Sequence, residues 1–210
     1  MNDIPEEKSK FKSIHLNLDD NITFSVKYKK CNNSKCIIWL PGRNDYFYHY
    51  HISQHFDDYD IYSILYRNCH ELKEDVTDYI YDIKQSHNEI DMVYDYFNLN
   101  LYDEVILYGH STGGLIAILY QDTTKNKINK MVLNAPWLHY KFNDYDHYIF
   151  NYLLYYIIPY MPEYDLTNNK SFRENKYVLM LSNKFNFDCI YKKKYNTPII
   201  SSWFRNIIDR

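Results

Sequence analysis

Glycine is scarce in this chain, and its few positions constrain the fold more than any other feature. Only four of the 210 residues are glycine, whereas an average composition of ~7% would supply roughly 15. Gly42 lies in Leu-Pro-Gly-Arg-Asn-Asp-Tyr-Phe, and the other three lie in Leu-Tyr-Gly-His-Ser-Thr-Gly-Gly: Gly109, Gly113 and Gly114. We therefore expect both segments to be loops whose geometry only glycine can supply.

Ser111 lies at the centre of the second glycine segment, which has the pattern G-x-S-x-G. In proteins with this pattern, the serine stands on a sharp turn between a buried strand and a helix, with its hydroxyl exposed. The flanking residues fit, because the apolar run Val105 to Tyr108 precedes the serine and a helical pattern runs from Thr112 to about Gln121. A helix-capping serine is the alternative, but two adjacent glycines weaken the first turn of a helix. We therefore expect Ser111 to be a catalytic nucleophile.

Alternating and apolar patterns predict a sheet with helices between its strands. Two alternating segments predict an antiparallel strand pair, Ser13 to Leu18 and Ile22 to Tyr28. Four apolar runs predict buried parallel strands: Ile37 to Leu40, Ile61 to Leu65, Val105 to Tyr108 and Met131 to Leu133. Apolar residues at spacings of three and four predict a helix from about Thr77 to Phe97. This alternation indicates an α/β fold with a doubly wound, mainly parallel sheet.

The expected turn around Ser111 suits the chemistry of acyl transfer. Open α/β sheets bind ligands at the carboxyl ends of their strands, where a helix N-terminus adds a positive dipole end. A tetrahedral intermediate needs donors fixed where its negative charge develops. We expect the backbone N–H groups of Thr112 and Arg43 to be these donors, since Gly42 allows the chain to turn sharply after its strand.

Charge and composition argue against several other classes of function. The net charge is −3 and no basic stripe is present, so nucleic-acid binding is not indicated. The four scattered cysteines lack metal-ligand spacing and are expected to be reduced structural thiols: Cys31, Cys36, Cys69 and Cys189. We predict neither a metal site nor a cofactor. The N-terminal residues include no apolar signal segment, which favours a cytoplasmic location.

The most apolar segment runs from Tyr148 to Met161 and is interrupted by Asn151 and Pro159. It is too short to cross a bilayer. We expect residues 138–210 to form a helical lid over a core of residues 1–137, with Tyr152 to Ile158 facing the pocket. The aromatic side chains would also suit a surface that contacts lipid, so a transient membrane contact is an open alternative.

Three stretches together resemble the α/β-hydrolase superfamily, especially serine hydrolases related to monoacylglycerol lipases and lysophospholipases: IIWLPGRNDYF, VILYGHSTGGLIA and MVLNAPWL. The C-terminal stretch FDCIYKKKYNTPIISSWFRNI is similar to the lid region of that family. The resemblance implies an esterase or lipase whose nucleophile is Ser111. The chain departs from the family pattern where Pro41 replaces a histidine of the oxyanion loop and where His139 replaces an aspartate.

The triad acid and base remain unknown from the sequence. In this superfamily the acid and then the histidine follow the serine, and the only histidines after Ser111 are His139 and His147. Both fit surface or lid positions better than a triad. Asp188 would be a candidate acid if residues 176–182 formed a core strand, whereas the resemblance places them in the lid. Under either interpretation no histidine follows, and we expect the last strands of the fold to be missing.

Three hypotheses follow from these observations. The first is hydrolysis of a carboxylic ester, with lipid esters as one option, through an acyl-enzyme on Ser111. The second is an inactive hydrolase-like protein that binds a ligand without turnover. The third is a truncated or split gene product, whose acid and histidine are encoded separately or lost. They differ in expected activity, because a serine without a neighbouring base is a weak nucleophile. The substrate and the oligomeric state do not follow from the sequence.

Overall fold

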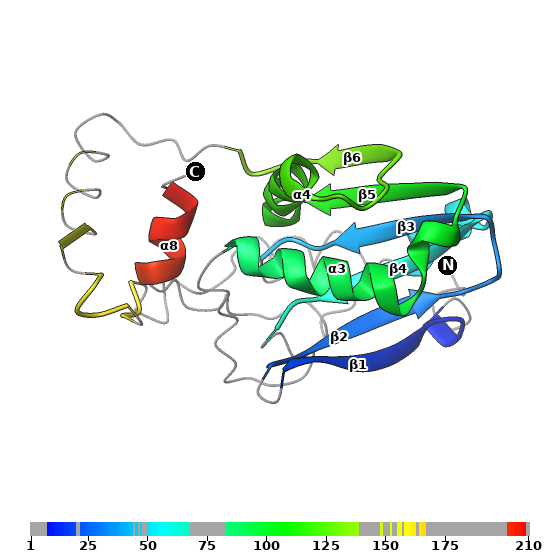
Figure 1. The fold of residues 1–210 in the computed structure, drawn as a ribbon, viewed down its shortest axis with the longest axis horizontal. Helices are drawn as coiled ribbons and strands as arrows, with labels where there is room; N and C mark the ends of the chain where they lie inside the picture. Colours follow the sequence, from blue (N-terminus) through cyan, green and yellow to red (C-terminus); the bar gives the residue numbers. More distant parts are fainter. Residues whose placement is uncertain are drawn as a thin grey trace, which may run out of the picture.

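The computed structural model describes residues 8–19, 22–43, 45, 47, 50–67, 83–138 and 201–208, with short runs and single positions between 148 and 166. Its main element is a six-stranded sheet with the order β1-β2-β4-β3-β5-β6 (Figure 1). The strands are β1 (Lys12–Asp19), β2 (Ile22–Lys29), β3 (Lys35–Leu40), β4 (Tyr59–Leu65), β5 (Glu104–His110) and β6 (Lys130–Asn134). The predicted antiparallel pair and the four predicted parallel strands are therefore present, whereas residues 176–182 lie outside the described residues.

The first two strands form the predicted antiparallel pair. Leu16 is aligned with Phe24, and both side chains are buried. The backbone N–H of Ile22 donates to the Asp19 carboxylate over 2.9 Å, which stabilises the connection between the strands. β2 also pairs antiparallel with β4, so β1 and β2 extend the sheet at the side away from β5.

The other four strands are parallel, so their carboxyl ends lie along one edge of the sheet. In Figure 1 the arrowheads of β3, β5 and β6 point toward the side where α8 (Ser201–Ile208) lies. The doubly wound, mainly parallel sheet is thus confirmed. Because such sheets bind ligands at the carboxyl ends of their strands, this edge is the expected place for a site.

Helices α3 (Ser86–Tyr96) and α4 (Thr112–Thr123) cover one face of the sheet (Figure 1). Their apolar side chains complete the larger buried cluster of the molecule, with members such as Ile38, Leu107, Ile90, Val93, Ile116 and Tyr120. α3 is shorter than predicted because the 3-10 turn η2 (Ile83–Gln85) precedes it. The predicted start at Thr77 lies outside the described residues.

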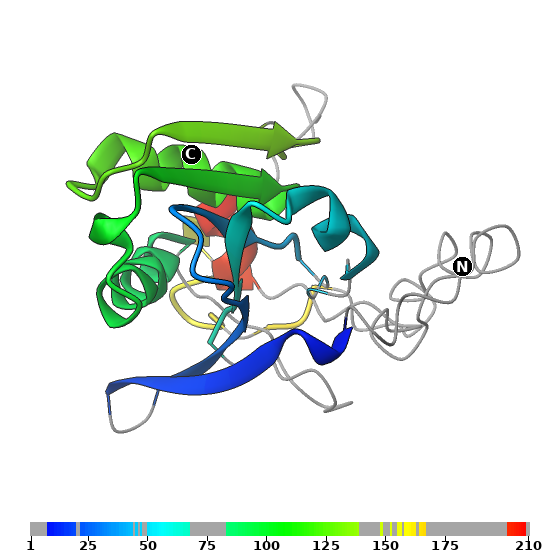
Figure 2. The ribbon, with the colours of Figure 1, turned by 90° about the vertical axis from the view of Figure 1, so that its right-hand side faces the viewer.

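The opposite face carries a smaller apolar cluster beneath the short helices α2 (Tyr50–Ser53) and η1 (Gln54–Phe56), which Figure 2 shows away from α3. In this cluster Trp39 stacks on Tyr108 with ring centroids 3.9 Å apart. On β5 the residues that face α4 are buried, whereas those on the opposite face are only half-buried. The two faces at β5 are therefore unequally covered.

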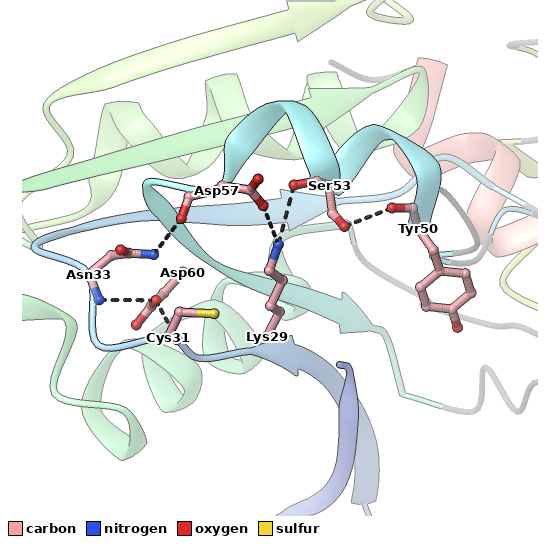
Figure 3. Close-up of polar contacts among 7 residues, drawn as sticks. All are labelled: Lys29, Cys31, Asn33, Tyr50, Ser53, Asp57 and Asp60. Carbon is pink, nitrogen blue, oxygen red and sulfur yellow. Dashed lines mark hydrogen bonds and ion pairs between the residues drawn. The ribbon is translucent and has the colours of Figure 1, made fainter. Parts of the chain in front are cut away.

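Buried lysines of β2 tie these short helices to the sheet. Nζ of Lys29 donates to the Ser53 carbonyl over 3.3 Å and forms an ion pair with Asp57 at 3.1 Å (Figure 3). Nζ of Lys27 donates to the Tyr50 hydroxyl over 2.9 Å. Hydrogen bonds with an ionised partner are stronger than neutral ones. These contacts therefore stabilise the packing of α2 and η1 against the sheet.

Asp60 organises the end of the sheet remote from the carboxyl edge. Its carboxylate accepts the backbone N–H of Cys31 over 2.8 Å and that of Asn33 over 3.3 Å (Figure 3). It also accepts the Tyr102 hydroxyl over 2.6 Å. The nearby Cys36 is a buried free thiol, and burial raises its pKa to about 12. This end of the sheet is structural, because its polar groups are paired with one another.

A buried ion pair fixes the chain where β4 ends. Nε of Arg67 donates to the Glu89 carboxylate over 2.6 Å, and the guanidinium also donates to the Gln85 carbonyl over 2.9 Å. Glu89 is fully buried, and this burial raises its pKa, while the bond to Arg67 acts in the opposite direction. Arg67 thereby connects the carboxyl end of β4 to the first turn of α3.

Only parts of the predicted lid, residues 138–210, lie among the described residues. The Ser201 hydroxyl donates to the Met161 carbonyl over 2.6 Å, and the Ser201 N–H donates to the Tyr164 carbonyl over 3.0 Å. These bonds join the first turn of α8 to Met161 and Tyr164. The assignment of residues 138–210 as a lid stays a prediction.

The expectation that Tyr152 to Ile158 face the pocket stays a prediction. Tyr152, Tyr155 and Tyr156 have side chains that are 56%, 62% and 56% exposed. The rings contact one another, with the centroids of Tyr152 and Tyr156 4.7 Å apart, and Arg205 lies 5.1 Å from the ring of Tyr155. Among the described residues of the predicted lining, Ile158 is buried. A hydroxyl on each ring lets these side chains remain in water at lower cost than phenylalanine.

Candidate active site

Ser111 lies between the end of β5 and the start of α4, at the carboxyl edge of the sheet. Its backbone has φ 52° and ψ −119°, outside the regions that side chains with a Cβ prefer. A conformation of this kind costs of order 1–3 kcal/mol and persists only where the surrounding structure enforces it. The strained turn predicted around Ser111 is therefore present.

Backbone hydrogen bonds hold Ser111 in this conformation. Its N–H donates to the Asn134 carbonyl over 3.1 Å, and its carbonyl accepts the N–H groups of Gly114 and Trp137, each over 2.9 Å. Asn134 is the last residue of β6 and Trp137 follows that strand, so the end of the neighbouring strand and the chain beyond it clamp the turn. None of these bonds involves the hydroxyl of Ser111, which is therefore available to contact a ligand.

The glycines of the motif are required by close packing. A Cβ atom on Gly109 would stand 2.6 Å from the Gly113 carbonyl oxygen, and one on Gly113 would stand 2.6 Å from the Pro41 carbonyl oxygen. Real Cβ atoms do not approach backbone this closely. Gly113 thus lets the first turn of α4 lie directly against the end of β3, which brings the loop after β3 beside Ser111.

Gly42 is required for a different reason from the one expected. None of the four glycines has a positive φ, so Gly42 does not serve a turn that only glycine can adopt. Its place is set by contact, because a Cβ atom there would stand 3.0 Å from the Cβ of Ser111 and 3.3 Å from the His110 ring. The N–H of Asp45 donates to the Gly42 carbonyl over 3.1 Å and closes the loop.

The predicted oxyanion donors lie on the two elements that meet at Ser111. Thr112 is the first residue of α4, where backbone N–H groups have no intrahelical acceptor and the helix dipole is positive. Arg43 follows Gly42 in the loop that contacts Ser111. The convergence of the Thr112 and Arg43 N–H groups on one point stays a prediction.

Asn134 and Ala135 are site residues that the sequence analysis missed. The Asn134 carbonyl accepts the Ser111 N–H and also contacts Nδ1 of His110 at 3.1 Å, which places a proton on that ring nitrogen. Ala135 has φ 45°, a left-handed conformation that alanine rarely adopts. The stretch MVLNAPWL marked this region by resemblance, but no residue type in it signals a left-handed alanine.

No acid or base partner of Ser111 is found within the described part of the chain, where no side chain hydrogen-bonds its hydroxyl. The histidine nearest in sequence, His110, is bonded to the Asn134 carbonyl instead. The candidates His139, His147 and Asp188 all lie outside the described residues. No group of three or more potential metal ligands occurs among the residues that were placed.

A family model described as serine aminopeptidase, S33, matches residues 67–187, which is more than half of the chain. The chain belongs to this hydrolase family. The match includes β5, Ser111 and α4, the elements that form the strained turn. A comparison with curated protein sequences found no significant match.

Solved structures similar to this family member share its fold at low sequence identity. The α/β-hydrolase GrgF from Penicillium sp. sh18 has a TM-score of 0.64 at 14% identity, over 95% of this chain and 73% of that one. A soluble variant of monoglyceride lipase from Saccharomyces cerevisiae, bound to a substrate analog, has a TM-score of 0.56 at 11% identity, over 95% and 67% of the two chains. A monoacylglycerol lipase from Paleococcus ferrophilus has a TM-score of 0.53 at 14% identity, over 94% and 70%. The α/β-hydrolase fold implied by the resemblance is confirmed.

Proposed function

We propose that this chain hydrolyses carboxylic esters with Ser111 as the nucleophile. The observation that carries the proposal is the strained backbone of Ser111, at φ 52° and ψ −119°, clamped between β5, α4 and the chain after β6. Strain of this kind lowers stability, and strained residues cluster at functional sites. A strained turn of this type presents a serine hydroxyl at the carboxyl edge of the sheet in enzymes with the G-x-S-x-G pattern.

The proposed reaction has two steps. Oγ of Ser111 attacks the ester carbonyl carbon, and the carbonyl oxygen takes up the negative charge near the N–H groups of Thr112 and Arg43. The alcohol then leaves with a proton, which produces an acyl-enzyme. Water attacks this acyl group, releases the carboxylic acid and restores the hydroxyl of Ser111.

We favour an ester over an amide as the substrate because no triad acid or base has been assigned. An amide nitrogen must be protonated before it leaves, whereas an activated ester can expel a stable alkoxide or phenolate. A serine without a positioned base is a weak nucleophile, so its reaction is slow even with an activated ester. We therefore expect slow turnover of activated esters by this chain alone.

Lipid esters are the substrate class that we favour, with transient contact to a membrane surface. The segment from Tyr148 to Pro162 contains no charged residue, yet Tyr148 is 69% exposed and Tyr160 is 87% exposed. Amphipathic tyrosine rings suit the boundary between lipid and water. Among the described residues, no helix is long and apolar enough to cross a membrane.

The test is hydrolysis of p-nitrophenyl butyrate and p-nitrophenyl dodecanoate by the wild-type chain and by Ser111→Ala. Ser13→Ala, at an exposed position of β1, is the matched control. We expect slow hydrolysis that Ser111→Ala abolishes and Ser13→Ala leaves unchanged, with the longer ester preferred. Equal rates for wild type and Ser111→Ala, with both variants folded, would overturn the proposal.

A ligand-binding protein without turnover is the second candidate. It is favoured by the Ser111 hydroxyl having no acid or base partner among the placed side chains. A non-hydrolysable alkyl phosphonate that lacks a leaving group would then bind with the same affinity to wild type and to Ser111→Ala, while neither hydrolyses esters. Calorimetric titration of both variants distinguishes this candidate from the enzyme.

A further inference from the structure

His110, the half-buried last residue of β5, lies between segments that follow or end two other strands. Its Nδ1 contacts the carbonyl oxygen of Asn134, the last residue of β6. Its Cδ2 lies beside Gly42, in the loop after β3, where a Cβ atom on the glycine would stand 3.3 Å from it. Nδ1 and Cδ2 are the two neighbours of Cγ, so these contacts are on opposite edges of the ring. The imidazole therefore spaces the β3 loop from the end of β6.

The contact with Asn134 fixes the orientation of the ring. A carbonyl oxygen can only accept, so Nδ1 of His110 carries the proton and donates over 3.1 Å. The same carbonyl accepts the Ser111 N–H over 3.1 Å. Asn134 is itself held, because its side-chain amide donates to the Tyr108 hydroxyl over 2.8 Å and the Tyr108 ring stacks on Trp39. One carbonyl of a well-held residue thus binds both the serine turn and the histidine ring.

The contact with Gly42 bears on the proposed oxyanion donor. The Gly42 carbonyl and the Arg43 N–H belong to one peptide group, and this carbonyl accepts the Asp45 N–H over 3.1 Å. A peptide group is planar and rigid, so a displacement of Gly42 also displaces the Arg43 N–H. The His110 ring and the Cβ of Ser111 leave little free space around Gly42. The ring therefore limits where the Arg43 N–H can lie.

We propose, on the basis of the proposed function, that His110 is a positioning residue whose ring sets the spacing between the Ser111 turn and the Gly42 loop. It acts through Asn134 on one edge and through Gly42 on the other. Donors stabilise an oxyanion only where its charge develops, and a misplacement of about 1 Å can cost roughly 10²-fold in rate. Loss of the ring should therefore slow the chemical steps and leave the binding of the ester nearly unchanged.

Steady-state hydrolysis of p-nitrophenyl butyrate tests this role. His110→Ala should lower kcat about tenfold and change KM by less than about twofold. His110→Phe keeps a ring beside Gly42 but cannot donate to Asn134, whereas His110→Asn keeps a donor and lacks the ring. Each retains one contact, so each should be faster than His110→Ala and slower than wild type. His55→Ala, at an exposed position of η1, is the control and should match wild type. An unchanged kcat in folded His110→Ala, a change confined to KM, or no gain in either conservative variant would overturn the proposal.

A double-mutant cycle in melting temperature tests the geometry independently of activity. Gly42→Ala should lower the melting temperature of the wild type by about 2–4 °C, because the added methyl group presses on the ring. In His110→Ala the shift should be less than about half as large, since residues in contact are energetically coupled. Equal shifts in both backgrounds would show that the ring does not confine Gly42 and would overturn the proposal. A wild type that hydrolyses no ester would remove the proposed function, and the cycle alone would then decide whether His110 positions Gly42.

Discussion

Gly42 and Ser111 lie so close together that a Cβ atom on the glycine would stand 3.0 Å from the Cβ of the serine. The two residues are far apart in sequence and belong to loops that follow different strands, β3 and β5. Their contact brings the proposed oxyanion loop to the proposed nucleophile. It also makes Gly42 a position where a single methyl group can disturb the site without disturbing the core.

Gly42→Ala should therefore reduce esterase activity more than stability. The added methyl group would press on the Cβ of Ser111 and on the ring and carbonyl oxygen of His110, which would have to give by a few tenths of an ångström. We expect about tenfold slower hydrolysis of p-nitrophenyl butyrate, since small misplacements cost one to two orders of magnitude in rate. Activity and thermal melting are measured side by side. A large loss of melting temperature with unchanged activity would contradict this account.

Gly113→Ala should instead destabilise the whole fold. Its Cβ would stand 2.6 Å from the Pro41 carbonyl oxygen, and a backbone atom cannot move aside as a side chain can. Overpacking costs typically 1–3 kcal/mol, and we expect the upper end of that range or more by urea denaturation. Asp122→Ala, at an exposed position of the same helix, is the control and should change the free energy of unfolding little.

Ser111→Gly should be more stable than Ser111→Ala. Alanine keeps the strain of φ 52°, whereas glycine adopts positive φ without a Cβ clash. Relief of roughly 1–3 kcal/mol of strain is partly offset by the entropy that glycine loses on folding, so the net gain should be about 1 kcal/mol. Urea denaturation of both variants measures the difference. Equal stabilities would mean that the turn is not strained.

The pairing of β5 with β6 should weaken in acid. A hydrogen bond from Lys130 lowers the pKa of the Glu104 carboxyl. An acid whose pKa is lower in the folded state stabilises above its unfolded pKa, and this contribution is lost as pH falls through the folded pKa. Glu104→Gln should thus melt below wild type at pH 7, and the gap should begin to narrow as the pH falls through the ordinary glutamate pKa of about 4.3 and close only below the lowered pKa of the folded state. A gap that widens in acid would be inconsistent with this sign.

Most of the fold could be predicted because each strand of the sheet carries its own pattern. The run Ile37 to Leu40 is apolar without interruption, as a strand buried on both faces must be. The glycines marked the strained turn because close packing excludes any side chain there. Both signals are local, so they are legible in one sequence.

The features that could not be predicted from the sequence depend on contacts between segments that are distant in the chain. Ala135 adopts φ 45° because the chain after β6 wraps around Ser111, and alanine itself gives no hint of this. Asn134 acts through its backbone carbonyl, which every residue possesses. The 56% exposure of Tyr152 could not be predicted either, because an aromatic ring with a hydroxyl suits both a core and a surface.

Covalent labelling by a fluorophosphonate tests the central claim most directly. The probe forms a bond from phosphorus to the nucleophilic oxygen and releases fluoride, so it marks the residue that attacks. After prolonged exposure of the folded chain, peptide mass spectrometry should locate one adduct on Ser111, and Ser111→Ala should show none. An adduct on another residue, or none on a chain shown to be folded, would contradict the assignment of Ser111 as nucleophile.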